Sequence, residues 1–158
     1  MAPVIRPYQP EDRAVTALIY WRAIMEGTVG VIGEAERLAW AGSPEPDLDT
    51  PDKLLNQWCW IAEEDGRPTG FMSLCPDGLL DMAFVVPEVR GKGTAAALYE
   101  VLLAKARSEG LNRLTVLASP FSRAFLARRG WQVDTEGLRE YHGHFYQLAE
   151  LSLDLGRS

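Results

Sequence analysis

The residues of this chain best suited to chemistry form one short segment, Arg90-Gly91-Lys92-Gly93-Thr94-Ala95. An apolar run over 79–86 precedes the segment and a helix-like apolar period over 95–106 follows it, which predicts a strand, a loop and a helix. Such a loop places successive backbone N–H groups at the start of the helix, beside two basic side chains. Glycine at two positions lets the backbone approach a ligand closely. The segment is therefore predicted to bind a phosphate or pyrophosphate group.

The same loop formally matches one nucleotide-binding pattern and nearly matches another. The spacing Gly91-x-Gly93-x-x-Ala96 fits the dinucleotide fingerprint, but that motif belongs in the first strand–helix turn of a fold, and here it lies mid-chain. A Walker A loop requires Gly-Lys followed by Ser or Thr, and here Lys92 is followed by Gly93. A dinucleotide-binding domain and a glycine-rich turn without a ligand are the less favoured alternatives.

The elements that must hold this loop alternate in a mixed order. The apolar pattern predicts strands over 3–7, 58–63, 69–75, 79–86, 113–118, 131–136 and 145–155. Helical periodicity and end signals predict helices over 10–27, 34–40, 50–57, 94–109 and 120–129. Turn signals at Asp65-Gly66 and Asp77-Gly78 join three of the strands into an antiparallel meander. The chain is therefore predicted to be one α+β domain over 1–158, with a mixed, mostly antiparallel seven-stranded sheet flanked by helices.

The composition limits the classes of function and of partner. A net charge of -6 argues against general nucleic-acid binding, which needs a basic surface. No apolar run approaches the ~18 residues of a membrane span, so no membrane contact and a cytoplasmic location are expected. Cys59 and Cys75 lack metal-site spacing, which predicts two buried, reduced thiols and no metal. The apolar terminal strand over 145–155 is a candidate exposed edge for a homodimer contact.

The chain as a whole resembles the GNAT superfamily of acyl-CoA-dependent N-acyltransferases. The stretch from Arg90 to Ala95 matches the family signature Q/R-x-x-G-x-G/A, and the preceding Val-x-Pro-Glu matches as well. Residues 125–131, Phe-Leu-Ala-Arg-Arg-Gly-Trp, are similar to a later Phe-Tyr-x-x-x-Gly-Phe element of the family. The opening Ile5-Arg6-Pro7 with Asp12 is similar to its usual start. The resemblance extends over nearly the whole chain in the right order, which makes it more specific than the loop alone.

This resemblance implies acetyl-CoA as the co-substrate and assigns roles along the chain. Backbone N–H groups from Gly91 to Ala95 would bind the pyrophosphate with the help of the helix dipole. Main-chain groups of Val85 and Val86 would bind the pantetheine arm as an added strand would, and one of their N–H groups would polarise the thioester carbonyl. Three side chains of the later helix would flank the pantetheine arm and the adenosine. The implied cofactor-binding residues are Val85, Val86, Arg90, Gly91, Lys92, Gly93, Thr94, Ala95, Phe121, Phe125 and Arg128.

The reaction that the family implies is direct attack of a primary amine on the thioester. It requires a base for the amine and commonly uses an acid for the leaving thiolate. Leu126 stands where many relatives carry a tyrosine acid, which is a departure from the family pattern. Tyr99, Ser122 and Tyr141 are candidate substitutes, with Ser122 first because it precedes Leu126 by one helical turn. The same departure keeps open a non-catalytic acyl-CoA-binding or regulatory module as an alternative function.

The candidate base is Asp81, the only acid in the apolar run over 79–86. On a regular strand its side chain would share a face with that of Val85, four residues later. The alternative is that Asp81 is a satisfied or solvent-facing strand residue without a part in catalysis.

The acceptor is expected to be a small-molecule or peptide amine. It would lie between 28–49 and 137–144, the two segments least like a general family pattern, because variable loops on a rigid scaffold set specificity. Trp40 is a candidate for the lining of this pocket. His142 and His144 would face the same way in an extended segment, where they could be a base, a substrate contact or ordinary loop residues.

Overall fold

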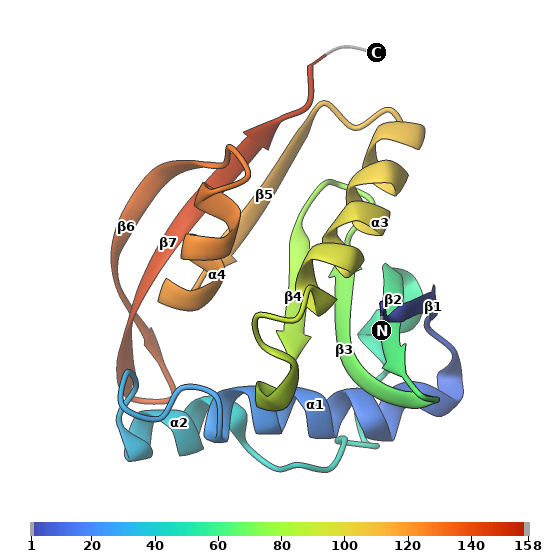
Figure 1. Cartoon of the computed structure of the whole chain (residues 1–158). Coiled ribbons are helices and arrows are strands. Elements are labelled where there is room, and N and C mark those ends of the chain that lie inside the picture. The colour runs from blue at the N-terminus through green and yellow to red at the C-terminus, as the bar shows by residue number, and fades with distance from the viewer. Residues whose placement is uncertain (1, 157–158) are drawn as a thin grey trace.

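The computed structural model describes residues 2–156, which form two antiparallel sheets covered by helices (Figure 1). The strands are β1 (Val4–Pro7), β2 (Trp58–Glu64), β3 (Arg67–Leu74), β4 (Leu80–Val85), β5 (Arg113–Ala118), β6 (Gln132–Tyr141) and β7 (His144–Asp154). The α-helices are α1 (Arg13–Met25), α2 (Glu34–Ala41), α3 (Thr94–Ser108) and α4 (Pro120–Ala127). Three 3₁₀ turns are η1 (Pro10–Asp12), η2 (Lys53–Asn56) and η3 (Pro87–Val89). Within the described part of the chain, no helix combines the length and the hydropathy that a membrane crossing requires.

The first sheet contains β1 to β4 in chain order, all antiparallel, which confirms the predicted meander of β2, β3 and β4. Asp65 and Gly66 both have positive φ, 52° and 76°, as a two-residue type I′ hairpin turn requires. Ile61 on β2 is paired with Phe71 on β3, so neighbouring strands place apolar side chains on the same face. This sheet supports β4, the strand that leads into the predicted cofactor loop.

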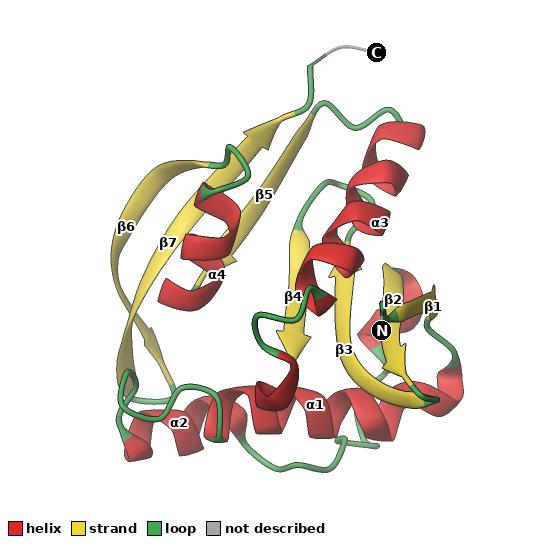
Figure 2. Ribbon diagram, in the orientation of Figure 1, coloured by secondary structure: helices red, strands yellow, loops and turns green. Residues whose placement is uncertain are grey.

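The second sheet contains β5, β7 and β6 in that order. The seven predicted strands are confirmed, but they lie in two sheets and not in one. Within residues 2–156, one isolated parallel bridge connects the two sheets, between Leu79 and Thr115. Beyond this bridge β4 and β5 diverge, and each is the edge strand of its own sheet (Figure 2). Apolar patterning shows that both strands exist, but it does not determine which edges pair.

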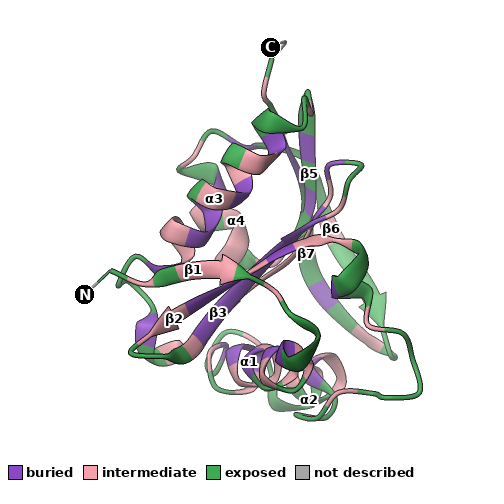
Figure 3. Ribbon diagram, turned by 90° about the vertical axis from the view of Figure 1, so that its right-hand side faces the viewer, coloured by how far each residue is buried: buried purple, intermediate pink, exposed green. Residues whose placement is uncertain are grey.

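Two apolar cores lie on opposite faces of the first sheet. α3 covers one face, where Leu98 and Leu102 are fully buried. α1 covers the other face, where Ile19 lies in one cluster with Ile61 and Phe71. Figure 3 shows α3 and α1 on opposite sides of β2 and β3. The alternation of side chains along these strands supplies one apolar set to each core.

The C-terminal hairpin corrects two predictions. The expected loop over 137–144 is absent, because β6 continues to Tyr141 and a two-residue turn leads directly into β7. His142 and Gly143 in this turn have positive φ, 50° and 77°, so His142 and His144 do not belong to one extended segment. The β6 side chains are almost all exposed, which removed the apolar alternation that marks a strand. The expected sheet edge over 145–155 is also wrong, because β7 lies between β5 and β6.

Two predicted helices differ from the structure at their starts. The helix expected over 10–27 divides into η1 and α1. The helix expected over 50–57 is only the 3₁₀ turn η2. Asp52, and not Thr50, caps η2 by accepting a hydrogen bond from the Leu54 N–H at 3.1 Å. A start this late leaves too few residues before β2 for an α-helix.

Candidate active site

The predicted cofactor loop has the backbone geometry of an anion site. Gly91 and Gly93, immediately before α3, have left-handed φ angles of 75° and 87°. A Cβ at either glycine would meet no atom within 4 Å, so the space in front of the loop is open. The leading N–H groups of α3 have no carbonyl partner within the helix. No side chain among residues 2–156 caps them either. This loop fits a pyrophosphate, and glycine is required at both positions because L side chains rarely adopt such φ values.

Contacts with β3 and α1 fix the position of the loop. The Val86 N–H donates to Thr69 O on β3 at 2.9 Å, and Val89 is buried. Arg22 on α1 donates two hydrogen bonds to the Glu88 carboxylate, at 2.7 and 2.9 Å. The Arg22 guanidinium holds the pKa of Glu88 below its usual range. Arg22 was not predicted as part of this region, because it precedes Glu88 by 66 residues and no local pattern connects them.

Arg90 joins two walls of the site. Its guanidinium donates to Gly27 O at 2.5 Å, just after α1, and lies 4.8 Å from the centroid of the Phe121 ring on α4. A Cβ at Gly27 would lie 2.6 Å from Arg90 Nη2, so glycine leaves room for this contact. Arg90 and Phe121 were both predicted as cofactor contacts, and the structure brings them together. Lys92 is exposed in the same loop.

The outer edge of β4 is open toward β5 beyond the bridge at Leu79. In an antiparallel ladder the N–H and C=O groups of successive residues alternate between the two edges of the strand. The Val86 N–H faces β3, so the N–H groups of Val85 and Ala83 face the opposite, open edge. Of the two predicted donors to a thioester carbonyl, Val85 is the one whose N–H lies on that edge.

Asp81 is the extra residue of a β-bulge in β4. The bulge interrupts the alternation of side chains, so the expectation that Asp81 shares a face with Val85 is wrong. Its carboxylate accepts a hydrogen bond from Gln57 Nε2 at 2.9 Å and pairs with Lys53 Nζ at 3.0 Å. Asp81 is therefore directed toward η2, and its part as a base stays a prediction.

The burial of Leu126, near the end of α4, explains why this position departs from the family pattern. This side chain is only 3% exposed and belongs to the α3 core, so the position of the family tyrosine is a core position here. The Ser122 hydroxyl donates to Ser119 O at 3.3 Å and lies 3.2 Å from the Ser119 hydroxyl, within the N-cap of α4. The predicted acid role of Ser122 stays a prediction that competes with this capping role.

The remaining predicted residues of α4 lie near its end. The Phe125 ring lies 3.6 Å from the Arg129 guanidinium and stands edge-on to the Tyr99 ring at 5.8 Å. The Tyr99 hydroxyl accepts a hydrogen bond from Trp131 Nε1 at 3.0 Å in the core, so it is already engaged there. Arg128 is exposed at the C-cap of the helix.

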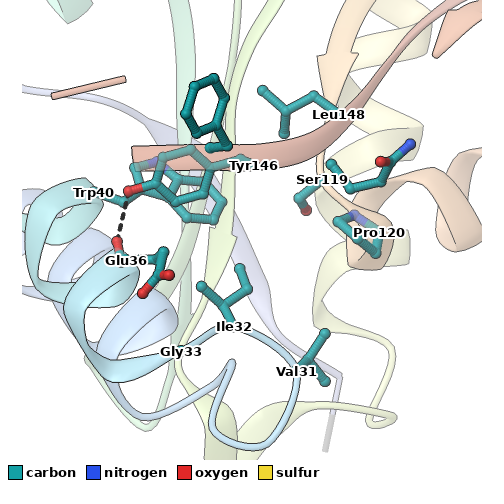
Figure 4. A pocket seen from close by; sticks show the side chains of 11 residues that line it. Val31, Ile32, Gly33, Glu36, Trp40, Ser119, Pro120, Tyr146 and Leu148 are labelled. Atoms are coloured by element: carbon teal, nitrogen blue, oxygen red, sulfur yellow. Dashed lines mark hydrogen bonds between the residues drawn. The ribbon is translucent and has the colours of Figure 1, made fainter. Parts of the chain in front are cut away.

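A pocket of about 250 Å³ lies where the α1–α2 connection, α2, the start of α4 and the start of β7 meet (Figure 4). The Trp40 and Tyr146 rings stand edge to face, 5.7 Å apart. The Tyr146 hydroxyl donates to the Glu36 carbonyl at 2.7 Å. Trp40, a candidate for the lining of the acceptor pocket, lines this pocket, whereas Glu36 and Tyr146 were not among the candidates. The lining residues are Val31, Ile32, Gly33, Glu36, Trp40, Ser119, Pro120, Phe145, Tyr146, Gln147 and Leu148.

A second hollow, of about 410 Å³, lies between α1 and the segment over 46–54. Arg13 crosses it and donates to Asp47 O and Thr50 O at 2.7 and 2.6 Å. None of its lining residues belongs to the cofactor loop or to α4. The smaller pocket is therefore the better candidate for an acceptor that must meet the thioester.

Tyr20 and Tyr141 do not line the smaller pocket, and Tyr20 lines the second hollow. Tyr20 donates to the Trp40 carbonyl at 3.3 Å, and its ring is edge-on to Phe84 at 4.8 Å. Burial raises the pKa of Tyr20, and the neighbouring Tyr141 adds to that effect. Tyr141 itself is 48% exposed at the end of β6, with its ring 4.1 Å from the ring of His142. Its predicted catalytic role stays untested.

The cysteines and acids form no metal centre in the described part of the chain. Both cysteines are free thiols, Cys59 buried as predicted and Cys75 only partly buried. Burial raises the pKa of Cys59 to about 12 and also raises that of Cys75. Both thiols are therefore protonated at neutral pH.

Comparison with known proteins agrees with this geometry. Residues 53–147 match the model of the acetyltransferase (GNAT) domain family. The chain is 32% identical, over 90% of its length and 89% of the relative, to YafP of Escherichia coli (strain K12), an uncharacterized N-acetyltransferase. It is also 32% identical to a GCN5-related N-acetyltransferase from Rhodopseudomonas palustris whose crystal structure is similar, with a TM-score of 0.89 over 98% and 97% of the two chains.

A solved structure of lower sequence identity extends the comparison of the fold. The PaiA N-acetyltransferase of Thermoplasma acidophilum, in complex with coenzyme A, has a TM-score of 0.78 at 17% identity over 98% of this chain and 99% of that one. The predicted α+β class is confirmed by these structural matches. The family match supports the expectation that acetyl-CoA is the co-substrate. The chain belongs to the GNAT family of N-acetyltransferases.

Proposed function

We propose that this protein transfers an acetyl group from acetyl-CoA to a small primary amine. The observation that carries the proposal is the position of Arg90, which contacts Gly27 on one side and Phe121 on the other. Gly27 leads into the α1–α2 connection that lines the pocket, and Phe121 follows the pocket residue Pro120. The anion loop and the pocket are thus neighbouring parts of one site.

The loop and the open edge of β4 would hold the two parts of coenzyme A. The leading N–H groups of α3 suit the pyrophosphate, and the N–H and C=O groups of Ala83 and Val85 suit the pantetheine amides. The bound thioester supplies an activated acetyl group. The Val85 N–H is placed to donate to an oxygen on which negative charge develops during attack, as in an oxyanion hole.

Pocket size favours a small acceptor. The pocket volume of about 250 Å³ is slightly below the ~300–1,000 Å³ that is typical of small-molecule sites. Its walls come from four segments of the chain, and this volume suits a small amine. The relative from Nocardia farcinica named L-2,4-diaminobutyric acid acetyltransferase, 31% identical over 86% of this chain, is an example of an enzyme for a small amine.

The departure at Leu126 does not prevent this reaction. An ordinary thiol has a pKa of about 8.5, so a thiolate is a tolerable leaving group at neutral pH and can take its proton from water. Proton removal from the acceptor ammonium is the step that needs help, and Asp81 is the proposed group because it is the acid on the strand that borders the site.

A second candidate function, an acyl-CoA-binding module without catalysis, is favoured only by Leu126. Both functions predict that coenzyme A raises the melting temperature. At about 100 times Kd the ligand would stabilise the protein by ~2.7 kcal/mol, a shift of about 5–10 °C. Only the enzyme releases free thiol from acetyl-CoA when primary amines are added. Stabilisation without thiol release would support the binding module, stabilisation by NAD alone would support a dinucleotide site, and no shift with millimolar coenzyme A would refute both proposals.

A further inference from the structure

The acceptor pocket contains one charged side chain, Glu36, among mostly apolar and aromatic neighbours. Figure 4 shows its carboxylate extending from α2 into the space near Ile32, on the side of Trp40 and Tyr146. Glu36 takes part in none of the ion pairs found among residues 2–156. A partly buried carboxylate without a cation is unfavourable unless a ligand or water compensates it, so its place in the lining calls for an explanation.

Helix stability explains only part of this arrangement. Glu36 is the third residue of α2, where the helix dipole favours an acid. Gly33 makes room for it, because a Cβ there would lie 2.9 Å from Glu36 Oε2. Glu34 occupies the same first turn and gives the same dipole benefit, but it is exposed and does not line the pocket. The pocket position of Glu36 is therefore more than the helix start requires.

The aromatic wall favours the same kind of ligand as the carboxylate. Trp40 and Tyr146 hold each other edge to face, and the hydrogen bond from Tyr146 to the Glu36 carbonyl fixes this wall against α2. Aromatic faces attract ammonium groups, most strongly where water is excluded. No basic side chain belongs to the described lining, so a carboxylate on the acceptor would have no partner there.

From these features we infer that the preferred acceptor is a small diamine without a carboxylate. The inference rests on the proposed function and names its substrate class. One terminal ammonium pairs with the Glu36 carboxylate beside the aromatic wall, and an apolar spacer lies along residues such as Ile32 and Leu148. The other amine reacts in its neutral form: its nitrogen forms a bond to the acetyl carbon, the carbon–sulfur bond breaks, the nitrogen loses one proton to a base, and the thiolate gains one from water.

Three amines with the same spacer test this inference with the full chain and acetyl-CoA: 1,5-diaminopentane, pentylamine, and lysine, which is the diamine with an added carboxylate. We expect kcat/KM for the diamine to exceed that for each of the others by about tenfold or more. Pentylamine lacks the second ammonium that would pair with Glu36, and lysine brings a carboxylate that would be left without a partner. Equal values for pentylamine and the diamine would overturn the inference while leaving the proposed function intact.

Two variants locate the effect. Glu36→Gln keeps the shape of the side chain but removes its charge, and it should lower kcat/KM for the diamine about tenfold and reduce its advantage over pentylamine. Glu34→Gln removes the same charge from the same helix turn and should leave the diamine preference as in the wild type. An unchanged preference in Glu36→Gln, or an equal loss in Glu34→Gln, would contradict the assignment.

Calorimetry separates failure of the inference from failure of the proposed function. Titration of 1,5-diaminopentane into the protein with coenzyme A present should show binding that Glu36→Gln weakens about tenfold and Glu34→Gln does not. Binding of coenzyme A without any binding of the diamine would reject the substrate class. Binding of the diamine with no thiol release from acetyl-CoA would keep the pocket assignment and reject the transferase.

Discussion

The two parts of the site are built in different ways. The predicted cofactor loop over 90–95 is one continuous stretch that presents backbone N–H groups, and its two glycines have left-handed φ angles. The acceptor pocket is assembled from side chains of four separate segments. Glu36 and Tyr146, which are hydrogen-bonded in its wall, lie 110 residues apart in the chain.

This difference has a functional consequence. A backbone site depends on a few φ angles and on the start of one helix, so it selects a ligand that every member of a family shares. A side-chain pocket can change at one position without disturbing the loop. Changes in the loop should therefore affect all acetyl transfer, whereas changes in the pocket should affect which amine is used.

The largest effect is expected at Gly93, where a control glycine separates backbone strain from loss of cofactor binding. Gly93→Ala places a Cβ where φ is 87°, which costs about 1–2 kcal/mol of folding free energy, and it also disturbs the anion loop. Gly110→Ala, at φ 73° after α3, causes the same strain far from the loop's N–H groups. Only Gly93→Ala should abolish the stabilisation by coenzyme A, measured as a melting shift. An equal loss of the coenzyme A melting shift in both variants would mean that the loop backbone does not bind the cofactor.

A smaller effect is expected on β4, the strand that leads into the predicted cofactor loop. Asp81→Asn should lower kcat about hundredfold if Asp81 is the base, with the affinity for coenzyme A unchanged by calorimetry. Lys53→Met removes the partner of Asp81 and keeps the carboxylate. A kcat loss of the same size in Lys53→Met would indicate that the ion pair is only structural, and an unchanged kcat in Asp81→Asn would eliminate the base assignment.

Restoration of the family tyrosine should not improve the enzyme. Leu126 is buried in the α3 core, so Leu126→Tyr inserts a larger side chain and a hydroxyl into a filled space. We expect the free energy of unfolding to fall by about 1–3 kcal/mol, measured by urea denaturation, without a gain in kcat. A stable variant with a higher kcat would show that position 126 faces the thioester after all.

The smallest effect concerns two tyrosines at high pH, Tyr146 in the pocket wall and Tyr20, which is hydrogen-bonded to the Trp40 carbonyl. Burial raises the pKa of both Tyr20 and Tyr146. The stability that depends on the neutral phenols is therefore fully present below about pH 10, which is the ordinary tyrosine pKa in an unfolded chain. It is lost as the pH rises through the higher pKa values of the folded protein. Absorbance titration should show both phenols ionising above pH 10, with each late step absent in Tyr20→Phe or Tyr146→Phe. Ionisation of either phenol below pH 10 would mean that its side chain is open to water.

The sequence predicted the parts of the site that depend on local conformation. The glycines at 91 and 93, the start of α3 at Thr94 and the meander before them follow from turn chemistry and periodicity, and each agrees with the structure. The family resemblance on the same residues is confirmed by the family match.

Features that depend on tertiary pairing were not predictable in the same way. The bulge at Asp81 reversed a face that regular alternation assigned, and the turn at His142 replaced an expected loop. The separation into two sheets depends on how β4 and β5 diverge, which neither strand encodes alone. Glu36 has a helix-start pattern that gives no sign of the distant Tyr146 beside it.

The most direct test of the account is a crystal structure of the protein with coenzyme A and 1,5-diaminopentane. We expect the pyrophosphate at the N–H groups that open α3, the pantetheine along the open edge of β4, and one ammonium of the diamine beside the Glu36 carboxylate. A pyrophosphate bound away from Gly91 and Gly93, or a sulfur atom with no path to the Glu36 pocket, would contradict this expectation.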